Sequence, residues 1–190
     1  MAYASLADIK TSLGISGSGE DSFIGNLQDQ IDAAINAHCD RPDGFASATH
    51  TSYLDGGAVS TLLLRNTTIT SITSVNDDLN RAFDSGSLIA ADDYNFISDT
   101  GELNLITSNF NNRQGTFQNG TGNVKVIYVG GYSTIPEDIQ LAAIVLISKY
   151  FNLRRSAGIS QMSAGGLSLS FDHGFPPEAK TLLKKYREIL

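Results

Sequence analysis

The spacing of apolar residues changes twice along this chain of 190 residues, and the change limits the folds that it can adopt. Residues 21–41 repeat their apolar side chains every three or four positions, which is the period of a helix, and residues 138–154 are apolar nearly all round. Residues 48–130 are instead rich in Thr, Val, Ile, Tyr and turn residues, with no helical stripe longer than two turns. The sequence therefore predicts an α+β fold, in which both chain ends form a small helical bundle and an antiparallel β-rich subdomain is inserted between them.

Capping residues locate the first two helices. Residues 5–8 have the spacing of a capping box, in which a Ser hydroxyl accepts an orphan backbone N–H, so a short helix should follow and stop at Gly14. Residues 18–21 repeat the box and predict a longer helix that ends near Arg41.

The middle of the chain carries strand and turn signals. Residues 53–64 and 96–105 each predict two strands joined by a turn, and the first pair contains an Asp-Gly step that favours the positive φ of hairpin turns. Residues 124–129 are apolar on both sides, which predicts a central or covered strand. Residues 69–75 space their apolar side chains three apart, so we expect a bulge or burial on both faces there.

The last third of the chain returns to helix. Residues 138–154 are apolar nearly all round, which is typical of a helix at the centre of a core. Residues 176–190 begin with Pro-Pro and predict an amphipathic helix. The expected domains are a helical core and a β-rich insertion, which span residues 1–46 with 131–190 and residues 47–130, respectively.

Charge is distributed unevenly along the chain. It carries 20 acidic and 13 basic residues, a net charge of −7. Residues 1–148 hold 17 acids and 6 bases, a net −11, whereas residues 149–190 hold 3 acids and 7 bases, a net +4. The C-terminal part therefore either meets an acidic partner or exposes two solvated helix faces. Wrapping of DNA on residues 1–148 is disfavoured, because phosphate binding needs a basic surface.

No targeting or membrane segment is expected. The single Cys39 cannot form an internal disulfide, and the chain does not begin with a basic stretch followed by an apolar run. The most apolar stretch, residues 141–147, is far shorter than the roughly 20 residues that span a bilayer. We expect a soluble protein that does not bind membranes.

Motifs with known chemistry are missing from the sequence. It contains no nucleotide-binding glycine loop, no serine hydrolase elbow and no zinc protease helix motif. His38 and Cys39 are interpreted as packing residues, and the acidic pairs at residues 77–78 and 92–93 as solvated turns rather than acid–base or calcium sites. We therefore predict no catalytic residue, no bound metal and no cofactor.

Several segments, taken in their order along the chain, resemble those of one protein family. The first four are Leu6-Ala7-Asp8-Ile9-Lys10, the helix of residues 21–41, Tyr53-Leu54-Asp55-Gly56-Gly57 and the stretch 63–75. The most specific is a strand at residues 124–132 that ends in Gly-Tyr and leads into a Pro-capped helix at residues 135–139. Together they resemble the head-tail connector (adaptor, or head-completion) proteins of tailed bacteriophages, and the resemblance covers nearly the whole chain.

The resemblance implies a structural role in the virion. Such proteins form rings of usually twelve copies beneath the portal protein and present a platform for the tail or a tail-completion protein. Double-stranded DNA passes through the central hole without specific binding. The implied location is the head–tail junction, after synthesis in the host cytoplasm, and neither catalysis nor a cofactor is implied.

The resemblance also suggests which residues meet the portal. The Gly/Ser-rich segment 156–174, which nevertheless carries large apolar residues, would be the partner-docking segment. Polar contacts are expected from basic residues of the C-terminal region and apolar anchoring from the docking segment. The expected contact residues are Arg154, Arg155, Lys180, Lys184, Lys185 and Arg187, with Met162, Leu167, Leu169 and Phe171 as anchors.

Two other functions stay open at this point. One is a ligand- or receptor-binding β module of a virion, which would expose aromatic residues on the insertion. The other is a hydrolase, which would need His50 or His173 gathered with two carboxylates in a pocket. A ring symmetry would favour the connector over both.

Overall fold

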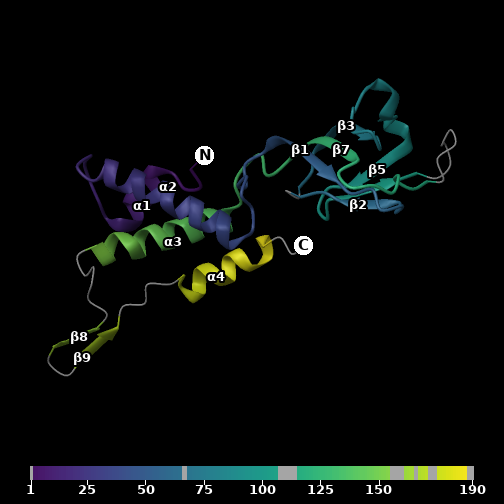
Figure 1. Ribbon diagram of the computed structural model, residues 1–190. Helices are drawn as coiled ribbons and strands as arrows, with labels where there is room; N and C mark the ends of the chain where they lie inside the picture. Colours follow the sequence, from purple (N-terminus) through teal and green to yellow (C-terminus); the bar gives the residue numbers. More distant parts are fainter. Residues whose placement is uncertain are drawn as a thin grey trace. The chain divides into compact units, whose positions relative to one another are not determined.

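The computed structural model describes residues 2–65, 68–106, 115–154, 161–164, 167–170 and 175–187. The chain forms two compact units, Met1–Gly44 with Thr134–Leu190, and Phe45–Ser133. The first unit is a helical bundle built from both chain ends, and the second is an antiparallel β-rich insertion (Figure 1). This confirms the predicted α+β fold class.

The first helix, α1 (Leu6–Leu13), begins and ends as predicted. The Ser5 hydroxyl oxygen accepts the backbone N–H of Asp8 at 3.1 Å, which caps the helix. Gly14 ends it in the left-handed conformation, with φ at 66°. Local sequence alone therefore accounts for this element.

The second helix, α2 (Asp21–His38), does not begin with the predicted capping box. Glu20 occupies the N-cap position and no side chain caps the helix, so the box at residues 18–21 is wrong. The two acidic side chains are engaged elsewhere: Glu20 binds Arg154, and Asp21 accepts a hydrogen bond from Lys10 at 2.7 Å. The helix ends at His38, a few residues before the predicted position near Arg41.

The third helix, α3 (Glu137–Leu153), lies at the centre of the bundle. It packs against α1 and α2 on one side and α4 on another (Figure 1). Its fully or nearly buried residues are Ile139, Ala142, Ala143, Leu146, Ile147 and Phe151. The apolar pattern all round the helix is explained by this central place, as predicted.

The last helix, α4 (Pro177–Leu183), is shorter than its sequence pattern predicts. A 3₁₀ turn, η4 (Lys184–Tyr186), follows it, and residues 188–190 lie outside the described part of the chain. Pro176 is the extended N-cap residue and Pro177 the first helical residue, where a missing N–H costs nothing.

An N-terminal segment before α1 is fixed on the surface of α2. Ala4 is buried, and its carbonyl oxygen accepts a hydrogen bond from the Gln28 amide at 2.6 Å. The Tyr3 N–H donates to Asp32 Oδ2 at 3.1 Å, and the Tyr3 hydroxyl bonds to Asn36. Burial raises the pKa of Asp32 to about 6, although the Tyr3 N–H acts in the opposite direction.

The β-rich insertion contains two antiparallel sheets. Their strands follow the order β1-β7-β3-β4 in the larger sheet and β2-β6-β5 in the smaller. The strands are β1 (Ala48–Leu54), β2 (Thr61–Leu63), β3 (Ser71–Asp77), β4 (Leu88–Ile89), β5 (Tyr94–Ile97), β6 (Glu102–Leu105) and β7 (Val124–Gly130). Two 3₁₀ turns, η1 (Ser85–Ser87) and η2 (Ala91–Asp93), flank β4.

Strand β7 is the central strand of the larger sheet, as predicted. Its alternate residues Val124, Val126 and Tyr128 are completely buried in the core that the two sheets share. Its neighbour β3 shifts register between Ile72 and Ser74, which confirms the expected bulge.

The hairpin predicted for residues 53–64 does not form. Strands β1 and β2 belong to different sheets, because β1 pairs with β7 and β2 pairs with β6. The Gly56 N–H bonds to Gly120 O at 3.0 Å and to Asn123 Oδ1 at 2.9 Å, so the loop that follows β1 is held by a distant loop. By contrast, the hairpin predicted for residues 96–105 is confirmed as β5 and β6.

Asp77 is buried, which corrects its prediction as part of a solvated turn. Its carboxylate accepts the Gln118 N–H at 2.9 Å and the Asn123 amide at 3.0 Å. The adjacent Asp78 accepts three backbone N–H groups of the loop that follows, and these bonds lower its pKa. The other acidic pair lies in η2, where Asp92 is exposed as expected.

The chain enters and leaves the insertion through two segments that bond to each other. Tyr132 donates its N–H to Phe45 O at 2.8 Å, and Ser47 donates to Tyr132 O at 2.9 Å. Gly131, directly before Tyr132, has φ at 99°, and an added Cβ there would lie 2.6 Å from Ala46 O. We call this pair of segments, residues 45–47 and 131–132, the backbone clip.

Replacing Gly56 should destabilise the insertion. An added Cβ would lie 1.9 Å from Gln118 O, so Gly56→Ala should lower the free energy of unfolding by about 1–3 kcal/mol. The control Gly25→Ala, with open space around its Cβ in α2, should raise it by about 0.5–1 kcal/mol. Chemical denaturation of both variants tests this, and a Gly56→Ala protein as stable as wild type would contradict the close approach.

Asp32 should make the bundle less stable as pH rises. Its folded pKa is about 6, above the ordinary value near 4, so the folded state binds the proton more tightly and stability falls between about pH 4 and 6. Asp32→Asn carries no charge at any pH and should therefore be more stable than wild type by about 1–2 kcal/mol at pH 7.5. At pH 4.5 the difference should nearly vanish. Urea unfolding at both pH values measures it, and a pH-independent difference would contradict this role.

Candidate partner-binding surface

The sequence-predicted contact residues begin with α4, which is fixed to the bundle by its apolar side. Ala179 and Leu183 are completely buried. Cys39, also buried, places its sulfur 4.0 Å from Leu183 O, and burial raises its pKa to about 11. His38 stacks on Phe175 with ring centroids 4.9 Å apart. Both His38 and Cys39 are thus packing residues, as predicted.

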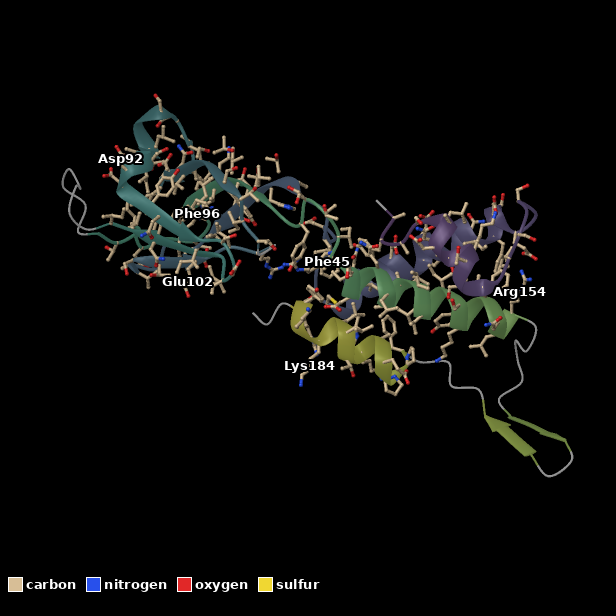
Figure 2. All side chains as sticks on the ribbon, turned by 180° about the vertical axis from the view of Figure 1, so that it is seen from behind. Phe45, Asp92, Phe96, Glu102, Arg154 and Lys184 are labelled. Carbon is tan, nitrogen blue, oxygen red and sulfur yellow. The ribbon has the colours of Figure 1, made fainter. Side chains whose placement is uncertain are left out.

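Three predicted basic residues lie on the exposed side of α4 and η4. Lys180, Lys184 and Arg187 are all exposed, and no described residue forms an ion pair with them. Figure 2 shows Lys184, at the start of η4, projecting on the side away from α3. We call these three residues the α4 basic face.

Lys185, by contrast, is engaged within the bundle. It forms an ion pair with Asp138 at the start of α3, and the Tyr186 hydroxyl donates to the same carboxylate at 3.3 Å. The hydrogen bond from Lys185 lowers the pKa of Asp138, and the pair raises the pKa of Lys185. This ion pair links η4 to α3.

Arg154 is also engaged by side chains of the bundle. Its guanidinium donates to both carboxylate oxygens of Glu20, at 2.6 and 2.9 Å, and lies over the ring of Phe151 with its carbon 4.0 Å from the centroid. The ring of Phe23 lies at 5.2 Å on another side. A planar group that is both stacked and paired at two oxygens fixes the end of α3 to the start of α2.

The docking segment is described only in part. Arg155 and Phe171 lie outside the described residues. Met162 belongs to β8 (Gln161–Ala164), and Leu167 and Leu169 belong to β9 (Leu167–Ser170). In this antiparallel pair Met162 is opposite Leu169 and Ala164 is opposite Leu167.

The histidines and the possible metal ligands of the described residues do not gather into a site. His50 lies on β1 beside Tyr128, with ring centroids 5.6 Å apart, and His173 is outside the described residues. Within the described ranges no three His, Cys, Asp or Glu residues gather in a way that could hold a metal. No described helix is long and apolar enough to cross a membrane.

The sequence did not predict the ion pairs Glu20–Arg154 and Asp138–Lys185. These pairs distinguish the two bases that are engaged within the bundle from the bases of the α4 basic face. Glu20 and Arg154 are distant in sequence, as are Asp138 and Lys185, and no local pattern links them. Each acid lies beside a helix start, but the helix dipole already favours a carboxylate there, so this position did not signal a partner.

Comparisons with known proteins give an independent result. The family model described as "Head completion protein" matches residues 3–189. A chain from the neck of an empty gene transfer agent (GTA) particle, computed with C6 symmetry, has a TM-score of 0.63 and 16% identity, covering 97% of this chain and 89% of that one. A chain from the neck of a native GTA particle, computed with C12 symmetry, has a TM-score of 0.49 and 14% identity, covering 93% and 94%. No curated protein sequence matches this chain.

The first of these structures shows that the whole fold is shared, bundle and insertion together, although the sequences have diverged widely. The family match confirms the predicted resemblance to head-tail connector and head-completion proteins. Because that match extends over nearly the entire sequence, this protein belongs to the head completion protein family.

Proposed function

We propose that this protein is a subunit of a ring at the head–tail junction of a tailed phage or phage-like particle. The ring lies between the portal protein and the tail or its completion protein, and double-stranded DNA passes through its centre. The family match over residues 3–189 carries the proposal, because it includes both the bundle and the insertion. The shared fold with a chain from a C6-symmetric particle neck supports it.

The architecture of the bundle suits a ring subunit. A closed ring needs two different surfaces on each subunit, since every copy contacts its two neighbours through unlike faces. With α3 at the centre, α1 and α2 cover one side and α4 another, so the bundle offers two unlike outer surfaces. The net charge of −7 also disfavours adhesion of the passing DNA.

The α4 basic face is the proposed contact with the portal. Lys180, Lys184 and Arg187 are exposed and have no ion-pair partner among the described residues, whereas Arg154 and Lys185 are engaged within the bundle. Apolar anchoring is proposed from Met162 and Leu169, which are paired in the β8–β9 sheet. A two-stranded sheet is marginally stable alone, so binding to a partner would stabilise it.

The proposed role contains no chemical step. Cys39 and His38, the residues closest to a reactive pair, are occupied by packing against Leu183 and Phe175. The protein would be made in the host cytoplasm and leave the cell inside the particle. Its work is done by binding its neighbours.

Reversing the charge of the α4 basic face should abolish portal binding. The triple variant Lys180→Glu, Lys184→Glu, Arg187→Glu replaces three exposed cations by anions, so its affinity for purified cognate portal should fall at least tenfold at physiological salt. The control reverses two bases of the insertion, Arg81→Glu and Lys125→Glu, and should bind as wild type. Cosedimentation with portal rings measures this.

A triple variant that binds portal normally, while thermal unfolding shows it to be folded, would remove the α4 basic face from the proposal. Because a free subunit can be monomeric, ring formation is judged in electron micrographs of the portal complex. A bound protein without rotational symmetry there would contradict the ring itself.

Purified particles should contain this chain in a fixed ratio to the portal. Quantitative mass spectrometry of density-gradient-purified virions measures that ratio, with the portal as internal standard. Particles from a strain that lacks the gene should accumulate as DNA-filled heads without tails. Tailed, infectious particles without this protein would contradict a place at the junction.

A further inference from the structure

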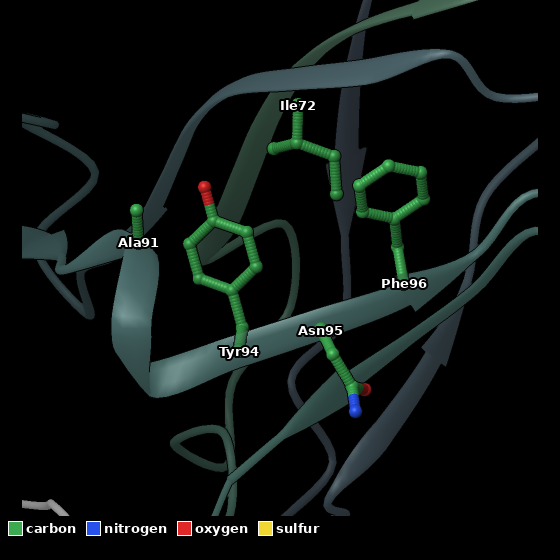
Figure 3. A pocket seen from close by; sticks show the side chains of 5 residues that line it. All are labelled: Ile72, Ala91, Tyr94, Asn95 and Phe96. Carbon is green, nitrogen blue, oxygen red and sulfur yellow. The ribbon is translucent and has the colours of Figure 1, made fainter.

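The insertion has an open groove at one side of its two sheets. The groove has a volume of about 380 Å³ and is lined by Ile72, Ala91, Tyr94, Asn95 and Phe96. Figure 3 shows that Tyr94 and Phe96 point to the same side as Ile72, whereas Asn95 points away. Apolar side chains from both sheets thus meet at a place that remains open to solvent.

The groove lies beside an unpaired strand edge. Strand β5 is the last strand of the smaller sheet, and no described strand pairs with its outer edge. Ile106 N–H bonds to Asp93 O at 2.8 Å and Gly101 N–H to Ile97 O at 2.9 Å. Because backbone groups alternate along a strand, those of Tyr94 and Phe96 point away from β6, toward the free edge.

Just past β5 this edge is covered, because Ser98 O accepts the backbone N–H groups of Thr68 and Ile69, each at 3.0 Å. Within β5 itself, at Tyr94 and Phe96, no described residue protects the edge against pairing. Natural edge strands are commonly very short, or carry Lys, Pro or a bulge. The edge strand β4 of the larger sheet has two residues, but β5 has four, all uncharged and none of them proline. On the outer face of the smaller sheet Ile97 is 46% exposed and Leu63, on β2, is 48% exposed. An apolar strand edge without a paired neighbour is suited to binding a partner strand.

Acidic residues surround the edge. Asp92 and Asp93 come directly before β5, Asp99 follows it, and Glu102 is opposite Ile97 on β6. Figure 2 labels Asp92 and Glu102 near the labelled Phe96 of β5. No Lys or Arg occurs between residues 82 and 112. An incoming segment with basic side chains would be attracted, and an acidic one repelled.

We infer that β5 is a docking edge for an extended, basic segment of a partner protein, which adds a strand to the smaller sheet. The backbone groups of Tyr94 and Phe96 bond the added strand, one of its apolar side chains enters the groove, and its Lys or Arg residues face the surrounding acids. The inference deepens the proposed function by giving the insertion its own binding surface. It needs neither the ring nor the portal, so its test can fail independently.

A model peptide can test the edge directly. The probe is a dye-labelled peptide, Lys-Val-Lys-Leu-Lys-Val-Lys, added to the full chain and followed by fluorescence anisotropy. Two control peptides replace every Lys by Glu or the central Leu by Pro. Binding of the Lys peptide with at least tenfold preference over both controls is expected, together with slower hydrogen exchange of the Tyr94 and Phe96 amides.

Variants then locate the site. Ala91 lines the groove and is exposed, so Ala91→Trp should fill the groove and weaken binding at least tenfold. Ala90→Trp is the matched control, since Ala90 is exposed but does not line the groove, and should bind within twofold of wild type. If Ala91→Trp is unfolded by circular dichroism, the double variant Asp92→Lys, Asp93→Lys takes its place, with the same expected loss.

Four outcomes would overturn the inference. The first is binding of the Glu peptide as tight as that of the Lys peptide, and the second is unchanged binding by the folded groove variant. The third is self-association of the chain, seen by sedimentation and lost in Ala91→Trp, which would make a second copy the occupant. No binding of the Lys peptide at millimolar concentration would equally contradict it.

Discussion

The burial of α3 is the interaction on which the rest of this protein depends. Its apolar residues, Ile139, Leu146 and Phe151 among them, are covered by helices that come from opposite ends of the chain. Helices α1 and α2 come from before residue 45 and α4 from after residue 133, so both ends of the chain complete the bundle. The insertion must therefore begin and end close to one point, which the backbone clip provides.

Elements defined by neighbouring residues could be predicted from the sequence, and those defined by distant ones could not. Ser5 and Gly14 cap α1 because their partners lie within a few residues, and the β5–β6 hairpin closes over a short loop. The Ser18 box failed, and its acid, Asp21, binds Lys10 of α1 instead, while Glu20 binds Arg154, so both partners lie outside the box. The hairpin at residues 53–64 failed because β7, far along the chain, pairs with β1.

The same distinction applies to the binding surfaces. The basic character of the C-terminal region was visible in the sequence, and Lys180, Lys184 and Arg187 are exposed there. Which bases are engaged depends on acids far away, such as Asp138 for Lys185. The edge strand β5 could not be recognised in advance, since its place in the sheet follows from pairings of β2 and β6 and from no property of residues 94–97 themselves.

The backbone clip has a consequence for how such a protein can change over time. The two short segments are bonded to each other through Tyr132 and Ser47, so lengthening, shortening or exchanging the strands beyond them leaves the spacing of the two backbones at this point unaltered. Selection on one module is thereby uncoupled from selection on the other. A lineage could refit the insertion to a new neighbour by recombination at residues 45 and 133 while retaining an inherited bundle.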